Sequence, residues 1–84
     1  MIEKIRAYIL MTVEIGKTES VLEELQHIDE AVRVAVTTGE YDIVVLVEVE
    51  NLEALYEITV HRIHKIPGIA ETTTSVVQKM ISVS

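Results

Sequence analysis

The sequence predicts a small α+β domain whose elements follow the order β-α-β-β-α-β. Four segments are rich in β-branched residues and alternate between apolar and polar positions, which is typical of strands. Two segments between them carry apolar residues at helical spacing. A glycine stands between the second and third strands, where a hairpin must reverse the chain. Together these observations favour an antiparallel sheet covered by two helices.

The first strand is expected over residues 5–14, because apolar residues recur at every second position until Gly16 ends it. A short helix follows the strand. Its N-cap is either Thr18 or Ser20, since Ser20 and Glu23 have capping-box spacing and Thr18 is an equally good cap. The side chains expected to be buried are Val21, Leu22, Leu25 and Ile28.

A tight hairpin is expected at Gly39-Glu40, because glycine readily adopts the positive φ of a type II′ turn. This turn joins strands over 31–38 and 41–49 and places Thr38 opposite Tyr41. The pairs expected on the helix side are Val36–Ile43, Val34–Val45 and Val32–Val47, and those on the other side are Thr37–Asp42, Ala35–Val44 and Arg33–Leu46. The later strand is then apolar on both faces, whereas such a hairpin normally turns one polar face to water.

The second helix is expected from an N-cap at Asn51 to about Lys65, and Pro67-Gly68 ends it. Its buried stripe is expected to comprise Leu52, Leu55, Thr59, Ile63 and Ile66. The last strand follows over 69–81, with Thr72, Thr74, Val76 and Met80 on one side. Right-handed crossovers place both helices on one face of a four-stranded antiparallel sheet whose central strands are the first and third, which is the ferredoxin-like arrangement.

The composition indicates that the uncovered face of this sheet is buried by self-association. Hydrophobic residues make up 49% of the 84 residues and the mean hydropathy is +0.33, although only 4% of residues are aromatic. Two helices from so short a chain can cover only one face. The other face is expected to carry an apolar patch that forms a dimer interface, made of Tyr8, Leu10, Ala35, Val44 and Leu46.

The charge and residue content exclude several classes of function. A net charge of −7 repels phosphate backbones, so no direct binding to nucleic acid is expected. The absence of cysteine excludes disulfides and thiolate metal sites, which suits a cytoplasmic protein. The N-terminus does not open as a signal peptide and no apolar run approaches membrane-spanning length, so no membrane association is expected.

Catalytic, metal and cofactor sites are not expected either. Glu57, His61 and His64 offer three candidate metal ligands on the second helix, but on a helix flank solvated surface histidines are favoured. No serine has a histidine and aspartate placed to activate it. The sequence therefore assigns no catalytic residue, no metal and no cofactor.

Two motifs resemble those of a known family. The segment Thr38-Gly39-Glu40-Tyr41-Asp42 resembles the Gly-Asp/Glu-Tyr-Asp signature of the RAM domain, which binds effectors in the Lrp/AsnC (feast/famine) transcriptional regulators. Ile66-Pro67-Gly68-Ile69 followed by Glu71-Thr72-Thr73-Thr74 resembles its closing motif. The resemblance implies a two-sheet homodimer, a ring of four such dimers, and amino-acid effectors bound between dimers near the hairpin and the start of the last strand.

Carried over to this sequence, the resemblance implies ligand contacts at Gly39, Tyr41, Asp42, Thr72 and Thr74. An aspartate carboxylate can take an α-ammonium group, while threonine hydroxyls and backbone N–H groups can receive an α-carboxylate. Family regulators carry a helix-turn-helix before this domain, whereas here the first strand begins at about Ile5. Residues 1–84 are therefore expected to be a single stand-alone domain without a helix-turn-helix, able to partner DNA-binding relatives.

Structural alternatives stay open for these positions. Asp42 could instead cap the turn or pair with Arg33 across the hairpin. Tyr41 points to the helix side in the expected register and could only seal the edge of the core. Thr72 and Thr74 are ordinary strand residues by propensity, and Gly39 suits the backbone of the turn whatever the function.

Three functions are consistent with this fold. The first is an amino-acid-sensing and oligomerisation module involved in transcription regulation of amino-acid metabolism. The second is a small dimeric ferredoxin-like enzyme of the cofactor-free monooxygenase or isomerase type, which the lack of tryptophan and the aliphatic core disfavour. The third is a purely structural oligomerisation domain without a ligand.

Overall fold

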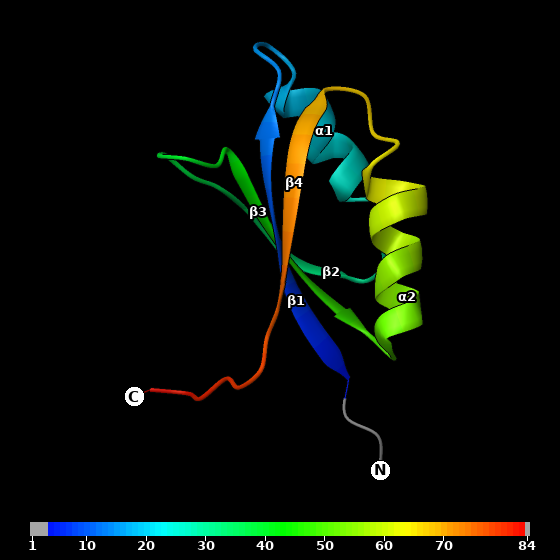
Figure 1. The fold of residues 1–84 in the computed structure, drawn as a ribbon. Coiled ribbons are helices and arrows are strands. Elements are labelled where there is room, and N and C mark those ends of the chain that lie inside the picture. Colours follow the sequence, from blue (N-terminus) through cyan, green and yellow to red (C-terminus); the bar gives the residue numbers. More distant parts are fainter. Residues whose placement is uncertain (1–3, 84) are drawn as a thin grey trace.

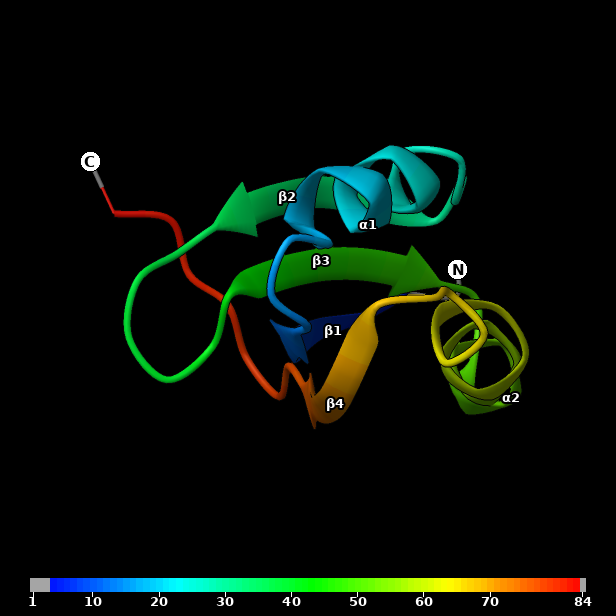
Figure 2. The same ribbon diagram turned by 90° about the horizontal axis from the view of Figure 1, so that it is seen from above.

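The computed structural model describes residues 4–83 and has the expected order of elements. These are β1 (Ile5–Val13), α1 (Thr18–Leu25), β2 (Ala31–Val36), β3 (Ile43–Val49), α2 (Leu52–Tyr56), the π-helix η1 (Glu57–Ile63) and β4 (Ile69–Val76). The strands lie in the order β2-β3-β1-β4, every neighbouring pair is antiparallel, and Figure 2 shows them in this sequence. Both helices lie on one side of the sheet (Figure 1). The α+β ferredoxin-like fold with two central strands, β1 and β3, is thereby confirmed.

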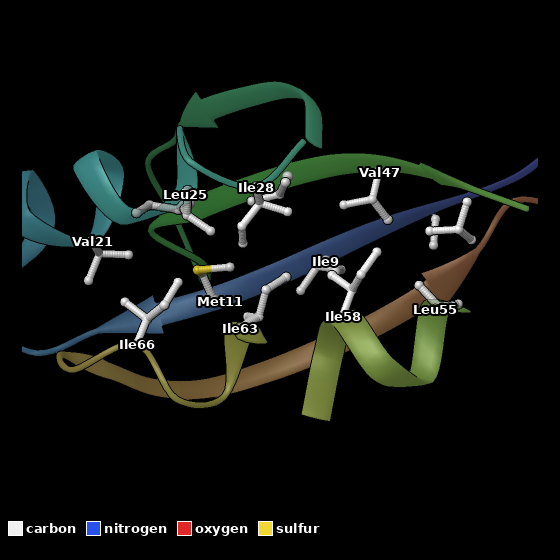
Figure 3. Close-up of a cluster of buried hydrophobic side chains, with 14 residues drawn as sticks. Ile9, Met11, Val21, Leu25, Ile28, Val47, Leu55, Ile58, Ile63 and Ile66 are labelled. Carbon is white, nitrogen blue, oxygen red and sulfur yellow. The ribbon is translucent and has the colours of Figure 1, made fainter. Parts of the chain in front are cut away.

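The hydrophobic core fills the space between the sheet and the helices (Figure 3). Its buried side chains are Ala7, Ile9 and Met11 from β1, Ile43, Val45, Val47 and Val49 from β3, and Val21, Leu25, Ile28, Leu55, Ile58, Ile63 and Ile66 from the helical layer. The expected stripe is confirmed from Leu55 onward but wrong at Leu52, which is 61% exposed. Leu52 is the first residue of α2, and its side chain extends beyond the core into solvent.

The register of the β2–β3 hairpin is confirmed over most of its length. Val36 pairs with Ile43, Val34 with Val45, Ala35 with Val44 and Arg33 with Leu46, as the period of two requires. The expected Val32–Val47 pair is wrong, because the register shifts between Ala31 and Arg33 and Ala31 takes the place opposite Val47. This bulge leaves Val32 half exposed on the edge strand.

The hairpin connection is longer than the expected two-residue turn. β2 ends at Val36 and β3 begins at Ile43, so residues 37–42 form a loop and Thr38 has no ladder partner in Tyr41. The Thr37 N–H donates to the Asp42 carbonyl over 2.9 Å and the Thr37 hydroxyl donates to the Tyr41 carbonyl over 2.7 Å. Gly39 has a φ of +106°, as its place in the turn predicts. In Figure 1 this loop projects away from the helices.

The helix ends agree only in part with the sequence. Asn51 caps α2 as expected, because its side-chain oxygen accepts the Ala54 N–H over 2.8 Å. Neither Thr18 nor Ser20 caps α1: the N-cap is Lys17, and the Ser20 hydroxyl donates back to the Lys17 carbonyl. The second helix remains helical close to the expected end but changes from α to π geometry after Tyr56.

Replacing Gly68 by alanine is expected to lower the free energy of unfolding by roughly 1–3 kcal/mol. Gly68 has a φ of +102°, and an added Cβ would lie 2.8 Å from Lys17 Cβ and 3.2 Å from Val21 Cγ2. Gly16→Ala is the matched control, since Gly16 has a φ of +83° but no atom within 4 Å of an added Cβ. Urea unfolding at equal protein concentration measures both. Equal losses for the two variants would show that close packing on α1 contributes nothing.

Candidate functional site

The clearest candidate site is a hollow between the hairpin loop, the end of η1 and the first half of β4. Its volume is about 540 Å³. It is open on one side, and its lining consists of Thr12, Glu40, Tyr41, His64, Ile69, Ala70, Glu71, Thr72 and Thr73. The lining therefore combines hydroxyl groups, two carboxylates, an imidazole and two apolar side chains, which suits a small ligand that has both polar and charged groups.

Tyr41 reaches this hollow from the hairpin loop. Its hydroxyl lies 3.5 Å from the Thr73 hydroxyl, at the long end of the hydrogen-bond range. Thr73 pairs with Leu10, whose side chain belongs to the sheet face without helices. The expectation that Tyr41 points to the helix side is therefore wrong. Tyr41 lies in the loop before β3, where the alternation of the strand does not hold. Its ring therefore reaches across the end of β1 toward β4.

Asp42 holds the loop to the end of β1 rather than lining the hollow. Its carboxylate accepts the Val13 N–H over 2.8 Å, and its own N–H donates to the Met11 carbonyl over 2.9 Å. These two bonds continue the β1–β3 ladder one step beyond its last pair, Met11 with Ile43. The alternative pairing with Arg33 is wrong, because no such ion pair occurs among the described residues. Within a single chain, the Asp42 carboxylate therefore already accepts a hydrogen bond from a backbone N–H.

The three other predicted site residues are divided between the hollow and its surroundings. Thr72 lines the hollow, and its hydroxyl lies 2.8 Å from Nε2 of His64. Thr74 is exposed, pairs with Ile9 further along β4 and is not part of the lining. Gly39 is exposed at the loop tip and is also absent from the lining. The structure therefore brings together Tyr41 and Thr72, but not Gly39, Asp42 or Thr74.

His64 is the main site residue that the sequence reasoning missed. The expectation of a solvated surface histidine is confirmed in that His64 is exposed, but its Nε2 also lies 2.8 Å from the Thr72 hydroxyl on β4. The one signal in the sequence is its position just before Pro67-Gly68, the turn that brings the helix end to the start of β4. His61 behaves as expected, since it is exposed and its Nε2 lies 4.0 Å from a Glu57 carboxylate oxygen.

The five residues predicted to form a dimer interface do lie on one surface. Tyr8 pairs with Leu46, Leu10 pairs with Val44, and Val44 also pairs with Ala35, so all five share the face opposite the helices. We call this group the bare face. Tyr8 is 38% exposed, and Arg6 and Glu48 form an ion pair of 3.0 Å at one end of the same face. Among residues 4–83 neither helix covers this face (Figure 1), although Met80 Sδ accepts a hydrogen bond from Arg6 at its end.

Two other features, a metal site and a membrane-spanning helix, are not found among residues 4–83. Within this range, no three histidine or acidic side chains gather closely enough to hold a metal ion. Over the same residues, no helix combines the length and the apolar character needed to cross a membrane.

Residues 6–83 match the family model of the Lrp/AsnC ligand binding domain. The chain therefore belongs to the Lrp/AsnC ligand-binding (RAM) domain family.

Its relatives agree with this membership. The HTH-type transcriptional regulator FL11 of Pyrococcus horikoshii is 40% identical over 73 residues, which are 87% of this chain and 48% of the regulator. The chain spans about half the length of the curated relatives it matches. These relatives are named as transcriptional regulators and not as enzymes, so the comparisons favour the regulatory interpretation over the monooxygenase or isomerase alternative.

Solved structures show the same fold. The crystal structure of FFRP-DM1 has a TM-score of 0.84 and 36% identity, and the match covers 87% of this chain and 97% of that one. Escherichia coli AsnC has a TM-score of 0.89 and 25% identity, with 95% of this chain covered but only 54% of AsnC. The domain therefore resembles almost the whole of the FFRP-DM1 chain and about half of the longer AsnC chain.

Proposed function

We propose that this chain is an amino-acid-binding and oligomerisation module that takes part in transcription regulation without binding DNA itself. The observation that supports the proposal best is the shared hollow of Tyr41 and Thr72. These residues come from the two separate motifs that resemble the RAM domain, and they line one space of about 540 Å³. This volume lies within the range of about 300–1,000 Å³ that is usual for small-molecule sites.

The lining of the hollow suits the two charged groups of a free amino acid. Glu40 and Glu71 can attract an α-ammonium group, while the hydroxyls of Tyr41 and Thr72 can donate to an α-carboxylate. In this proposal Asp42 and Gly39 act by shaping the loop that carries Tyr41, and Thr74 plays no direct part. The open side of the hollow is closed by a neighbouring dimer, as the resemblance implies.

The proposed assembly begins with two sheets packed through their bare faces. A sheet with apolar residues on its uncovered face favours such packing, because burial removes that surface from water. Further association of dimers into a ring would bring the hollows to the contacts between dimers. A DNA-binding relative could join the same ring through its own RAM domain. The net charge of −7 supports a module that leaves contact with DNA to such partners, and the absence of cysteine suits the cytoplasm.

Titration calorimetry with the twenty amino acids, up to millimolar concentration, tests the proposal. At least one is expected to bind, and Tyr41→Phe together with Thr72→Val is expected to weaken that binding at least tenfold. Tyr56→Phe is the matched control, because Tyr56 is exposed on α2 and does not line the hollow. If neither an amino acid nor a related metabolite binds to the wild type, the sensor proposal fails and a structural oligomerisation domain takes its place.

A further inference from the structure

One buried side chain of the core is polar, although the side chains around it are aliphatic. Thr59 is 9% exposed and is the only polar residue among the buried side chains of residues 4–83. Its neighbours on the helical stripe, including Ile58 and Ile63, are aliphatic. Valine has nearly the same shape and would avoid burying a hydroxyl, which is costly unless the hydroxyl is hydrogen-bonded. The presence of threonine at this position therefore calls for a specific use of its oxygen.

The Thr59 hydroxyl bonds to the helix backbone where α2 passes into η1. Its Oγ1 lies 3.1 Å from the Leu55 carbonyl oxygen and 3.1 Å from the Tyr56 carbonyl oxygen. Threonine hydroxyls that bond back to carbonyls three or four residues earlier compete with the backbone amides and often bend helices. At the other end of η1, the His64 N–H donates to the Thr59 carbonyl over 2.9 Å, which is an i→i−5 bond. Both polar groups of Thr59 thus take part in the wide turn.

The wide turn decides where His64 lies. Each residue of an α-helix turns by about 100°, so with regular spacing His64 would lie about 180° from Leu55, opposite the buried face. A π-helical turn contains an extra residue and displaces the following side chains around the axis by up to about 100°. This displacement accounts for the observed contact, in which Nε2 of His64 lies 2.8 Å from the Thr72 hydroxyl.

His64 also has a distinct place in the charge pattern of the hollow. It is the only lining residue that can become positively charged, whereas Glu40 and Glu71 supply negative charge. Because His64 lies beside the Thr72 hydroxyl, the two side chains together would suit an α-carboxylate.

We propose that Thr59 is a positioning residue of the effector hollow: its hydroxyl maintains η1, and η1 brings His64 to Thr72. The inference rests on the proposed function for the role of the hollow. The part of the inference that concerns the position of His64 does not depend on whether a ligand binds.

Two substitutions separate the hydroxyl of Thr59 from its shape. Thr59→Val keeps the volume and removes the hydroxyl, whereas Thr59→Ser keeps the hydroxyl and removes a methyl group. The first readout is the contact between the His64 ring and the Thr72 side chain. It is detected in the isotope-labelled protein by nuclear Overhauser effects and by the chemical shifts of the ring nitrogens. The second readout is the affinity for whichever amino acid binds the wild type.

Thr59→Val is expected to lose the His64–Thr72 contact and to weaken binding about tenfold, the effect of about one net hydrogen bond, without lowering the melting temperature. Thr59→Ser is expected to retain the contact and to bind within about twofold of the wild type. His64→Ala should weaken binding as much as Thr59→Val does, and His61→Ala, on the same helix but outside the hollow, should not. If Thr59→Val does not fold, Thr59→Ala is compared with Thr59→Ser instead, because these two variants differ only in the hydroxyl.

The proposal is overturned if Thr59→Val keeps both the contact and the affinity, or if Thr59→Ser loses them as Thr59→Val does. In the second case the packing of the methyl group, not the hydroxyl, places His64. A wild-type protein that binds no amino acid refutes the sensor proposal. The contact readout still decides in that case whether Thr59 places His64, so the two failures are distinguishable.

Discussion

Replacing Leu46 by glutamate is expected to reduce the solution mass of the protein to that of a single chain. Leu46 lies near the middle of the bare face, between Tyr8 on β1 and Arg33 on β2. A carboxylate there would be buried without a partner when two bare faces pack together, and such a charge costs several kcal/mol. Light scattering at micromolar concentration measures the mass directly.

Leu52→Glu is the control for this experiment. Leu52 is 61% exposed in the first turn of α2, outside both the core and the bare face. A glutamate near a helix N-terminus is also favourable, so the fold should be unaffected and the mass unchanged. The account is wrong about the interface if Leu46→Glu keeps the mass of the wild type.

Replacing Asp42 by alanine is expected to lower the free energy of unfolding by about 1–3 kcal/mol and to weaken effector binding. The partly buried Val13 N–H would lose its acceptor at 2.8 Å, and the loop that carries Tyr41 would lose its attachment to β1. Thermal unfolding must be compared at equal protein concentration, because assembly makes the melting temperature depend on concentration.

Asp42→Asn separates the two roles considered for this residue. The asparagine side chain keeps an oxygen that can accept the Val13 N–H but removes the negative charge. If Asp42 only shapes the loop, this variant should keep most of the stability and bind effector within about threefold of the wild type. If it binds as poorly as Asp42→Ala while remaining stable, the carboxylate contacts the ammonium group directly, and our assignment to loop shape fails.

The sequence was sufficient to predict the order of elements and most of the sheet register. Strand alternation has a period of two, so one correctly placed pair such as Val36–Ile43 determines the facing of its neighbours. The bulge at Val32 was not predictable in this way, because an inserted residue leaves the local pattern apolar and β-branched. The hairpin loop was also missed, since the turn signal at Gly39 does not reveal how far from the turn the strands separate.

The candidate site was less predictable because its contacts join distant parts of the chain. Asp42 was placed in the site by its motif, but its bond to Val13 depends on how β1 and β3 meet beyond their last pair. The sequence predicts the exposure of His64 but not its contact with Thr72, because Thr72 lies on another element beyond the Pro67-Gly68 turn. The change from α to π geometry was not predictable either, because Leu55, Thr59 and Ile63 are buried at α-helical spacing.

The most direct test of the central claim is the solution mass of the wild-type protein, measured by light scattering with and without the amino-acid panel. We expect a dimer or a multiple of it, redistributed by at least one amino acid. A stable monomer of 9.4 kDa at micromolar concentration, with Val44 and Leu46 open to water, would contradict the account.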